Sequence, residues 1–222
     1  MSAELSLLRL LQLCSASLPV GAYAFSQGLE GAIEQGKVAD VSAVKEWVSL
    51  SLAHSLAKTD APILLRMIVV NQQTDKQRLH YWNNYLLACR ESHELRLSDV
   101  AMGAALKRVL LQLGAHEQLL SFDELAYATA FAIAVDQWRI DCLDAVHGFL
   151  WSWLENQIAA ATKLLPMGQS QAQQLLFELA SEIPTAIKTA QKVNDKNIGA
   201  SMPGFAMISA WHETQYSRLC RS

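Results

Sequence analysis

The residues best placed to hold a metal ion are Cys89 and His93, which lie four positions apart. On one helix this spacing would put a thiolate and an imidazole on the same face, where both could contact one ion. Structural zinc sites use four ligands, and no third ligand is apparent in the sequence. We therefore favour a buried thiol near a surface imidazole, and we predict neither a metal site nor a bound cofactor.

Motifs for catalysis are also incomplete. Three His-Glu pairs, at His93, His116 and His212, begin like the HExxH sequence of zinc proteases, but none has the second histidine. The chain has no GxSxG nucleophile motif and no GxxxxGK[ST] or GxGxxG phosphate loop. The sequence does not exclude a catalytic triad assembled from residues distant in sequence. The sequence nevertheless favours a protein that is not an enzyme, so linked nucleotide chemistry would belong to a partner.

Composition excludes further classes. The 18 basic and 21 acidic residues give a net charge of −3, which provides no general attraction to nucleic-acid phosphates. The longest strongly apolar stretch, residues 125–135, is well short of the roughly 20 residues that cross a membrane. Four scattered cysteines and a start without a basic signal-peptide region predict a cytoplasmic protein with free thiols.

Helical periodicity dominates the elements that must position these residues. Apolar residues recur every three or four positions at Val41, Val44, Val48, Leu52 and Leu56. Asp40 is a suitable N-cap for this helix, and Pro62 suits the first turn of the next. Ser121 and Glu124 resemble a capping box that opens a helix over residues 122–137.

Other helices are expected over the ranges 4–14, 24–35, 75–95, 98–113, 140–164, 169–181 and 203–213. The best β-branched run, residues 68–70, lies inside a helical pattern, and no break resembles an interdomain linker. We therefore predict one all-α globular domain of about ten helices over residues 1–222.

The residue types in two segments are not explained by packing alone. Residues 18–30 place a proline, two glycines and aromatic residues in a turn that leads into a helix, which is compatible with an ordinary helix–turn–helix corner. Residues 211–222, the C-terminal tail, contain Trp, Tyr, Leu and two Arg, which are types common at interface anchors. Docking of this tail on its own chain is the equal alternative.

Together these segments resemble the urease accessory protein UreF family. The matching blocks follow one another along nearly the whole chain, at Leu8–Gln12, Ser17–Gly21, Ser26–Glu30, Arg90–Glu91, Glu94–Arg96, Trp153, Glu155–Asn156, Lys163–Gln169, His212–Leu219 and Arg221–Ser222. Each block is moderately specific, and their joint occurrence is highly specific. The chain departs from the family at Cys14–Ser17, where a Ser-Pro-Ala run is usual, and at Cys220, where Phe is frequent.

The resemblance implies an all-α homodimer that acts as an adaptor, or assembly chaperone, in nickel insertion into apo-urease. It implies a complex with the accessory protein UreD, also called UreH. That complex would recruit the nickel-carrying GTPase UreG, whose GTP hydrolysis the chain would modulate. There are two competing classes. One is a hydrolase whose catalytic site is assembled from residues distant in sequence, and the other is a metal carrier whose site is centred on Cys89 and His93.

The same resemblance assigns partner-binding residues. The C-terminal tail is expected to bind UreD through Trp211, His212, Glu213, Tyr216, Arg218, Leu219 and Arg221. The surface that faces UreG is expected to contain Glu30, Lys163, Pro19, Gly21 and Gln27.

Charge spacing adds two local expectations. Arg90 and Glu94 are four positions apart, which predicts an ion pair within one helix. Among Arg90, Glu91, Glu94 and Arg96, the exposed residue of each ion pair is a weaker candidate for partner contact. Glu155 and Lys163 are eight apart, so they share a face if their helix is continuous.

Overall fold

The computed structural model describes residues 2–114, 117–200 and 202–221, and this part of the chain is all-α without a strand. The fold class predicted from the sequence is thus confirmed. The α-helices run over α1 Ala3–Leu13, α2 Leu29–Glu34, α3 Val41–Ser51, α4 Ala61–Gln72, α5 Lys76–Ala88, α6 His93–Gln112, α7 Tyr127–Gln137, α8 Cys142–Leu164, α9 Gln169–Ala180, α10 Ile183–Lys192 and α11 Pro203–His212. Short 3₁₀ turns occupy η1 Ala22–Ala24, η3 Glu117–Ser121 and η4 Asp195–Asn197.

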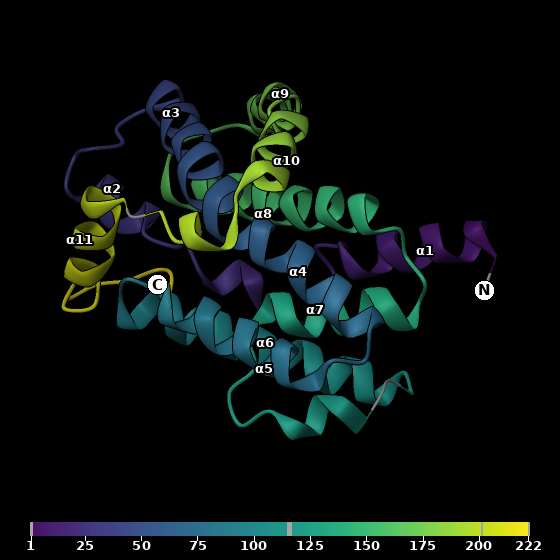
Figure 1. Cartoon of the computed structure of the whole chain (residues 1–222). Coiled ribbons are helices and arrows are strands. Elements are labelled where there is room, and N and C mark those ends of the chain that lie inside the picture. The colour runs from purple at the N-terminus through teal and green to yellow at the C-terminus, as the bar shows by residue number, and fades with distance from the viewer. Residues whose placement is uncertain (1, 115–116, 201, 222) are drawn as a thin grey trace.

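The core forms around α4, α7 and α8, which lie in the middle of the molecule (Figure 1). The apolar stretch noted in the sequence supplies most of α7, and its residues 128–135 are buried on every side. Burial all round is the reason for its unbroken apolar character. No helix of the described residues is both long and apolar enough to cross a membrane.

Helices α3 and α4 form one continuous helical run, joined by a π-helical segment η2, Leu52–Asp60. Pro62 stands just after this segment, in the first turn of α4, as predicted. Proline has no N–H to offer the carbonyl four residues earlier. That carbonyl, on Lys58, instead accepts a hydrogen bond from the N–H of Gly199 at 3.3 Å. A loop distant in sequence thereby satisfies the backbone at the joint.

Asp40 caps α3 as expected, because its carboxylate accepts the Ala43 N–H at 2.9 Å. Replacing this aspartate by alanine should lower the free energy of unfolding by about 1 kcal/mol, since an orphan N–H loses its acceptor. Urea denaturation measures the change. Asp123→Ala is the matched control, because Asp123 is exposed and caps no helix. Equal effects of the two substitutions would contradict the capping role.

The prediction of one helix over residues 75–95 is wrong. Helix α5 ends at Ala88, and α6 begins at His93, not at residue 98. Ser92 caps the new helix by accepting the Leu95 N–H at 3.1 Å. A serine in this position offers the backbone an alternative to helix continuation. Cys89 is the C-cap of α5 and His93 is the first residue of α6, so the two do not lie on one helix.

The predicted capping box at Ser121 and Glu124 is also wrong. Ser121 ends the 3₁₀ turn η3, and α7 starts later, at Tyr127. The first turn of α7 is capped from other helices: the Asn83 side chain accepts the Ala126 N–H at 3.0 Å, and Asp99 accepts the Tyr127 N–H at 2.8 Å. Tertiary contacts, which local sequence does not reveal, decide where this helix begins.

The helix expected over residues 24–35 is shorter in the structure. A 3₁₀ turn ends at Ala24, and α2 begins only at Leu29. Gln27 and Gly28, between them, have φ angles of 51° and 89°. These left-handed conformations interrupt a right-handed helix. No helix was predicted over residues 183–192, which form α10, although Pro184 marks its first turn.

Candidate functional site

The C-terminal tail folds back onto its own chain. Helix α11 packs against α2 at the end of the molecule opposite α1, and residues 213–221 continue past it toward α6 and α8 (Figure 1). At its far end, the Arg221 N–H donates to the Ala24 carbonyl at 2.7 Å. Ser222 lies outside the described residues.

The carboxylate of Glu30 receives the backbone of the tail. Its Oε1 accepts the Leu219 N–H at 2.6 Å, and its Oε2 accepts the Cys220 N–H at 2.7 Å. Glu30 lies in the first turn of α2, and its own N–H donates to the Ser26 hydroxyl at 3.2 Å. Hydrogen bonds to an ionised carboxylate are about twice as strong as neutral ones. The tail is therefore attached through main-chain donors at two successive positions.

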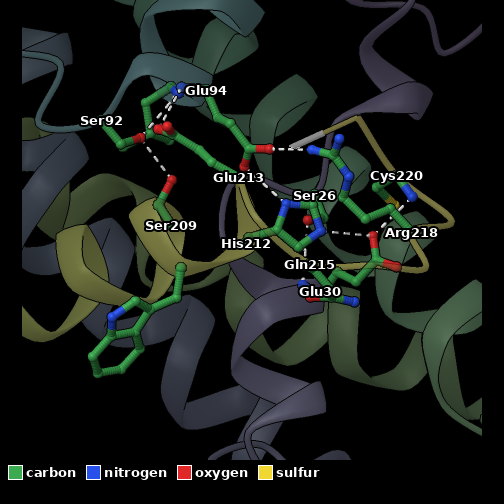
Figure 2. Close-up of polar contacts among 12 residues, drawn as sticks. Ser26, Glu30, Ser92, Glu94, Ser209, His212, Glu213, Gln215, Arg218 and Cys220 are labelled. Carbon is green, nitrogen blue, oxygen red and sulfur yellow. Dashed lines mark hydrogen bonds and ion pairs between the residues drawn. The ribbon is translucent and has the colours of Figure 1, made fainter.

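His212, at the end of α11, lies between two carboxylates (Figure 2). Its Nδ1 is 2.8 Å from Glu94 Oε2, and its Nε2 is 3.2 Å from Glu30 Oε2. Arg218 donates to the other oxygen of Glu94 at 2.8 Å. The His212 side chain is fully buried, with 0% of its surface exposed, and the two glutamates are nearly so. We call Glu30, Glu94, His212 and Arg218 the tail-anchoring cluster.

Further polar contacts join the tail and α11 to the start of α6 and to Ser92 just before it. Glu213 accepts the Glu94 N–H at 3.3 Å, in the first turn of α6, where backbone donors lack helical partners. The hydroxyls of Ser92 and Ser209 are 2.7 Å apart in a buried contact. These two serines and Glu94 were not predicted as tail contacts. The family block at Glu94–Arg96 and the spacing from Arg90 had singled out Glu94, but neither indicated a contact with the tail.

Several large side chains of the tail point away from the protein. Tyr216 is fully exposed, Leu219 is 77% exposed and Trp211 is 52% exposed. Tyr23, from η1, is also exposed at 69%. Trp and Tyr are among the side chains that most often anchor protein–protein interfaces, and here the backbone that carries them is held in place.

The residues predicted to face UreG are not all together. Lys163, near the end of α8, donates to the Tyr23 carbonyl at 2.8 Å and lies 5.1 Å from the centre of the Tyr23 ring. Gln27 accepts the Trp153 indole N–H at 2.7 Å. Glu30 is covered by the tail, so a partner could reach it only after the tail moves.

Pro19 and Gly21 belong to the turn before η1. Gly21 has a φ angle of 75°, which glycine adopts without strain. Helix α8 is continuous from Glu155 to Lys163, as the eight-residue spacing assumed.

The predicted ion pair between Arg90 and Glu94 is wrong. Arg90 instead bridges two buried aspartates, donating to Asp60 at 2.6 Å and lying 2.8 Å from Asp99. Arg90 precedes α6 in a non-helical segment, so it does not share a helical face with Glu94. Burial acts to lower the pKa of Arg90, but the carboxylates of Asp60 and Asp99 outweigh this effect and raise the pKa above its usual value.

A cavity of about 100 Å³ borders this bridge and is lined partly by Cys89 and Tyr127. Within the described ranges, no three His, Cys, Asp or Glu side chains converge to hold a metal ion. His116 lies outside those ranges.

The four cysteines are free thiols, as predicted. Burial, followed by the charge of Glu155, raises the pKa of Cys14 to about 12. Burial and the Glu30 carboxylate raise the pKa of Cys220 to about 11. A thiol is nucleophilic only as the thiolate. Neither cysteine has the environment of a reactive group near neutral pH.

These features define the class of protein: it is all-helical, and a cluster of buried charged groups anchors a C-terminal segment that displays apolar side chains. A family model described as UreF matches residues 38–180. Relatives over the whole length carry the name urease accessory protein UreF. One from Marinomonas sp. is 49% identical, covering 100% of this chain and 96% of that protein. One from Alkalilimnicola ehrlichii is 43% identical, covering 96% and 95% respectively. The chain belongs to the UreF family of urease accessory proteins.

Proposed function

We propose that this protein is a non-enzymatic adaptor in the cytoplasm that helps insert nickel into apo-urease. It binds UreD (UreH) and the GTPase UreG in one assembly, as a homodimer, and modulates GTP hydrolysis by UreG. Membership of an accessory-protein family supports a role in urease maturation. The observation that carries the adaptor role is the tail, whose backbone is anchored while Trp211, Tyr216 and Leu219 remain outward.

The tail supplies the proposed contact with UreD. Trp and Tyr at the centre of an interface are among the residue types that most often dominate binding energy, and the exposed Leu219 supplies further apolar surface. His212, Glu213, Arg218 and Arg221 serve this contact by fixing the tail's position: His212, Glu213 and Arg218 through α2 and α6, Arg221 through the Ala24 carbonyl. The exposed side chains would thus contact UreD, whereas the buried contacts hold the tail in position.

The proposed surface for UreG includes Lys163, Gln27, Pro19 and Gly21, with Glu30 below the tail. Lys163 and Cys220 lie close enough for the lysine charge to act on the thiol. Because Glu30 holds the tail, any movement of the tail would change the surface that UreG meets on this side. The two proposed partner surfaces therefore share one residue.

Co-purification with UreD tests this function. We expect the unmodified chain to capture UreD, and the double variant Tyr216→Ala, Leu219→Ala to capture at least about tenfold less, since interface anchors contribute roughly 2 kcal/mol or more each. The Leu219→Ala change keeps the backbone N–H that Glu30 accepts. UreG is then added to the captured complex, and its retention and GTP hydrolysis are measured.

A matched control is Phe177→Ala, which removes an exposed aromatic side chain from α9. It should leave capture of UreD unchanged. Equal capture by the unmodified chain and the tail variant would refute the tail as the UreD contact. Failure of the unmodified chain to capture UreD would refute the adaptor role itself.

A further inference from the structure

The contacts of His212 require a proton that its neutral side chain cannot supply. Both ring nitrogens face carboxylate oxygens, Nδ1 toward Glu94 and Nε2 toward Glu30. An ionised carboxylate only accepts hydrogen bonds, and a neutral imidazole has one N–H donor and one acceptor nitrogen. With a neutral ring, one of the two contacts would therefore bring two acceptors together.

An additional proton resolves the conflict. A free imidazole is more basic than a free glutamate, with pKa values of about 6.5 and about 4.3, so the ring is the preferred place for the proton. An imidazolium donates from both nitrogens and satisfies both carboxylates.

Charge balance supports the same assignment. With the proton, the tail-anchoring cluster has two negative charges, on Glu30 and Glu94, and two positive charges, on His212 and Arg218. Without it, the cluster would have a net negative charge while three of its four side chains are buried. An uncompensated buried charge is costly.

We propose that His212, Glu30 and Glu94 form a proton-binding site that links docking of the C-terminal tail to pH. The docked tail holds one proton between α2, α6 and α11. A released tail exposes His212 and both glutamates to water, where at mildly alkaline pH the ring is neutral and the carboxylates are ionised. Release therefore gives up a proton, and rising pH favours the released tail. This inference does not depend on which partner the tail contacts.

The surrounding charged groups leave this balance in place. Arg218, from the tail, already pairs with Glu94 Oε1. Glu213, the next residue after His212, interacts with the Glu94 N–H and not with the ring. On the other side, Cys220 contacts Glu30, and burial with the Glu30 charge raises its pKa to about 11, which keeps the thiol neutral over the relevant pH range. Lys163 lies beyond Cys220 and lowers the pKa of that thiol only in part.

Glu94→Gln is the decisive variant. A glutamine in this position can accept from Arg218 through its carbonyl oxygen and donate from its amide to His212 Nδ1. His212, as the neutral ring, then donates from Nε2 to Glu30, so every contact is kept without the extra proton. Glu30 still receives the Leu219 and Cys220 N–H groups. The variant should dock its tail with little dependence on pH.

Tail release is measured by the rate of tryptic cleavage after Arg218 in the full chain. Between about pH 7 and about pH 9, the rate for the unmodified chain, divided by that for Glu94→Gln at each pH, should rise by roughly tenfold or more, because linkage of one proton allows up to tenfold per pH unit. Division by the variant removes the pH dependence of the protease. A constant ratio would overturn the proposal.

Nitrogen NMR of the His212 ring in the unmodified chain gives an independent answer that does not require the variant to fold. Both ring nitrogens should be protonated while the tail is docked, and one should lose its proton in the same pH range in which cleavage begins. A docked His212 with a single protonated nitrogen would overturn the proposal, whatever the cleavage rates.

Discussion

Replacing Arg90 by alanine should lower the free energy of unfolding by about 3–5 kcal/mol, because the two buried aspartates that it bridges would lose their counter-charge. Arg90 donates from one nitrogen each to Oδ1 and Oδ2 of Asp60, at 2.6 and 3.2 Å, and from Nε to Asp99 at 2.9 Å. Both carboxylates have side chains that are only 6% exposed. The loss is large because it leaves the partners unpaired, not because the bridge itself is strong.

Urea denaturation at neutral pH measures this effect. Arg90→Lys is the matched variant: it keeps the positive charge but not the planar fork that serves two carboxylates at once. We expect Arg90→Lys to be less destabilising than Arg90→Ala, but still less stable than the unmodified chain. A cost below about 1 kcal/mol for Arg90→Ala, which is typical of an exposed ion pair, would show that the bridge is not buried.

The second large effect is expected at Gly103, where α6 crosses the chain that leads into α7. A Cβ at this position would lie 1.9 Å from the Leu125 carbonyl oxygen and 2.9 Å from the Ala126 carbonyl carbon. These are backbone atoms, so no side-chain rotation can relieve the overlap. Gly103→Ala should cost roughly 3 kcal/mol or more, at the upper end for overpacking, because the helix and the segment must separate.

Gly204→Ala is the appropriate control. Gly204 lies in the first turn of α11, and a Cβ there would meet no atom within 4 Å. Alanine is the better helix former, so this variant should be neutral or slightly more stable. Relative to the unmodified chain, Gly103→Ala should therefore unfold at a lower temperature and a lower urea concentration. Gly204→Ala should unfold at the same or slightly higher values. Similar stability for both would contradict the close approach of α6 to residues 125–126.

Much of the fold could be predicted from periodicity and caps. The spacing of apolar residues and the Asp40 cap correctly indicated α3, because both depend on neighbours in sequence. The errors occurred where distant residues decide. Asn83 and Asp99 determine the start of α7, and Ser92 divides a stretch that otherwise has the composition of one helix.

The tail-anchoring cluster was only partly predictable. The composition of residues 211–222 indicated a segment with an anchoring role, and the family resemblance pointed to Glu30. No local pattern indicated that the two would meet, because they are separated by almost the whole chain and joined through backbone N–H groups, which every residue type except proline has. That Glu94 pairs with His212 and Arg218, and not with Arg90, likewise depends on the break before α6.

Attachment through the main chain has a consequence for how this surface can vary among relatives. Glu30 holds positions 219 and 220 by their N–H groups, so it exerts no selection on side-chain identity at position 219. Mutations at Tyr216 and Leu219 can therefore accumulate without detaching the segment. Such an arrangement separates the choice of contacting side chain from the attachment of the segment, so a change in partner affinity on substituting Tyr216 or Leu219 would report on the contact itself.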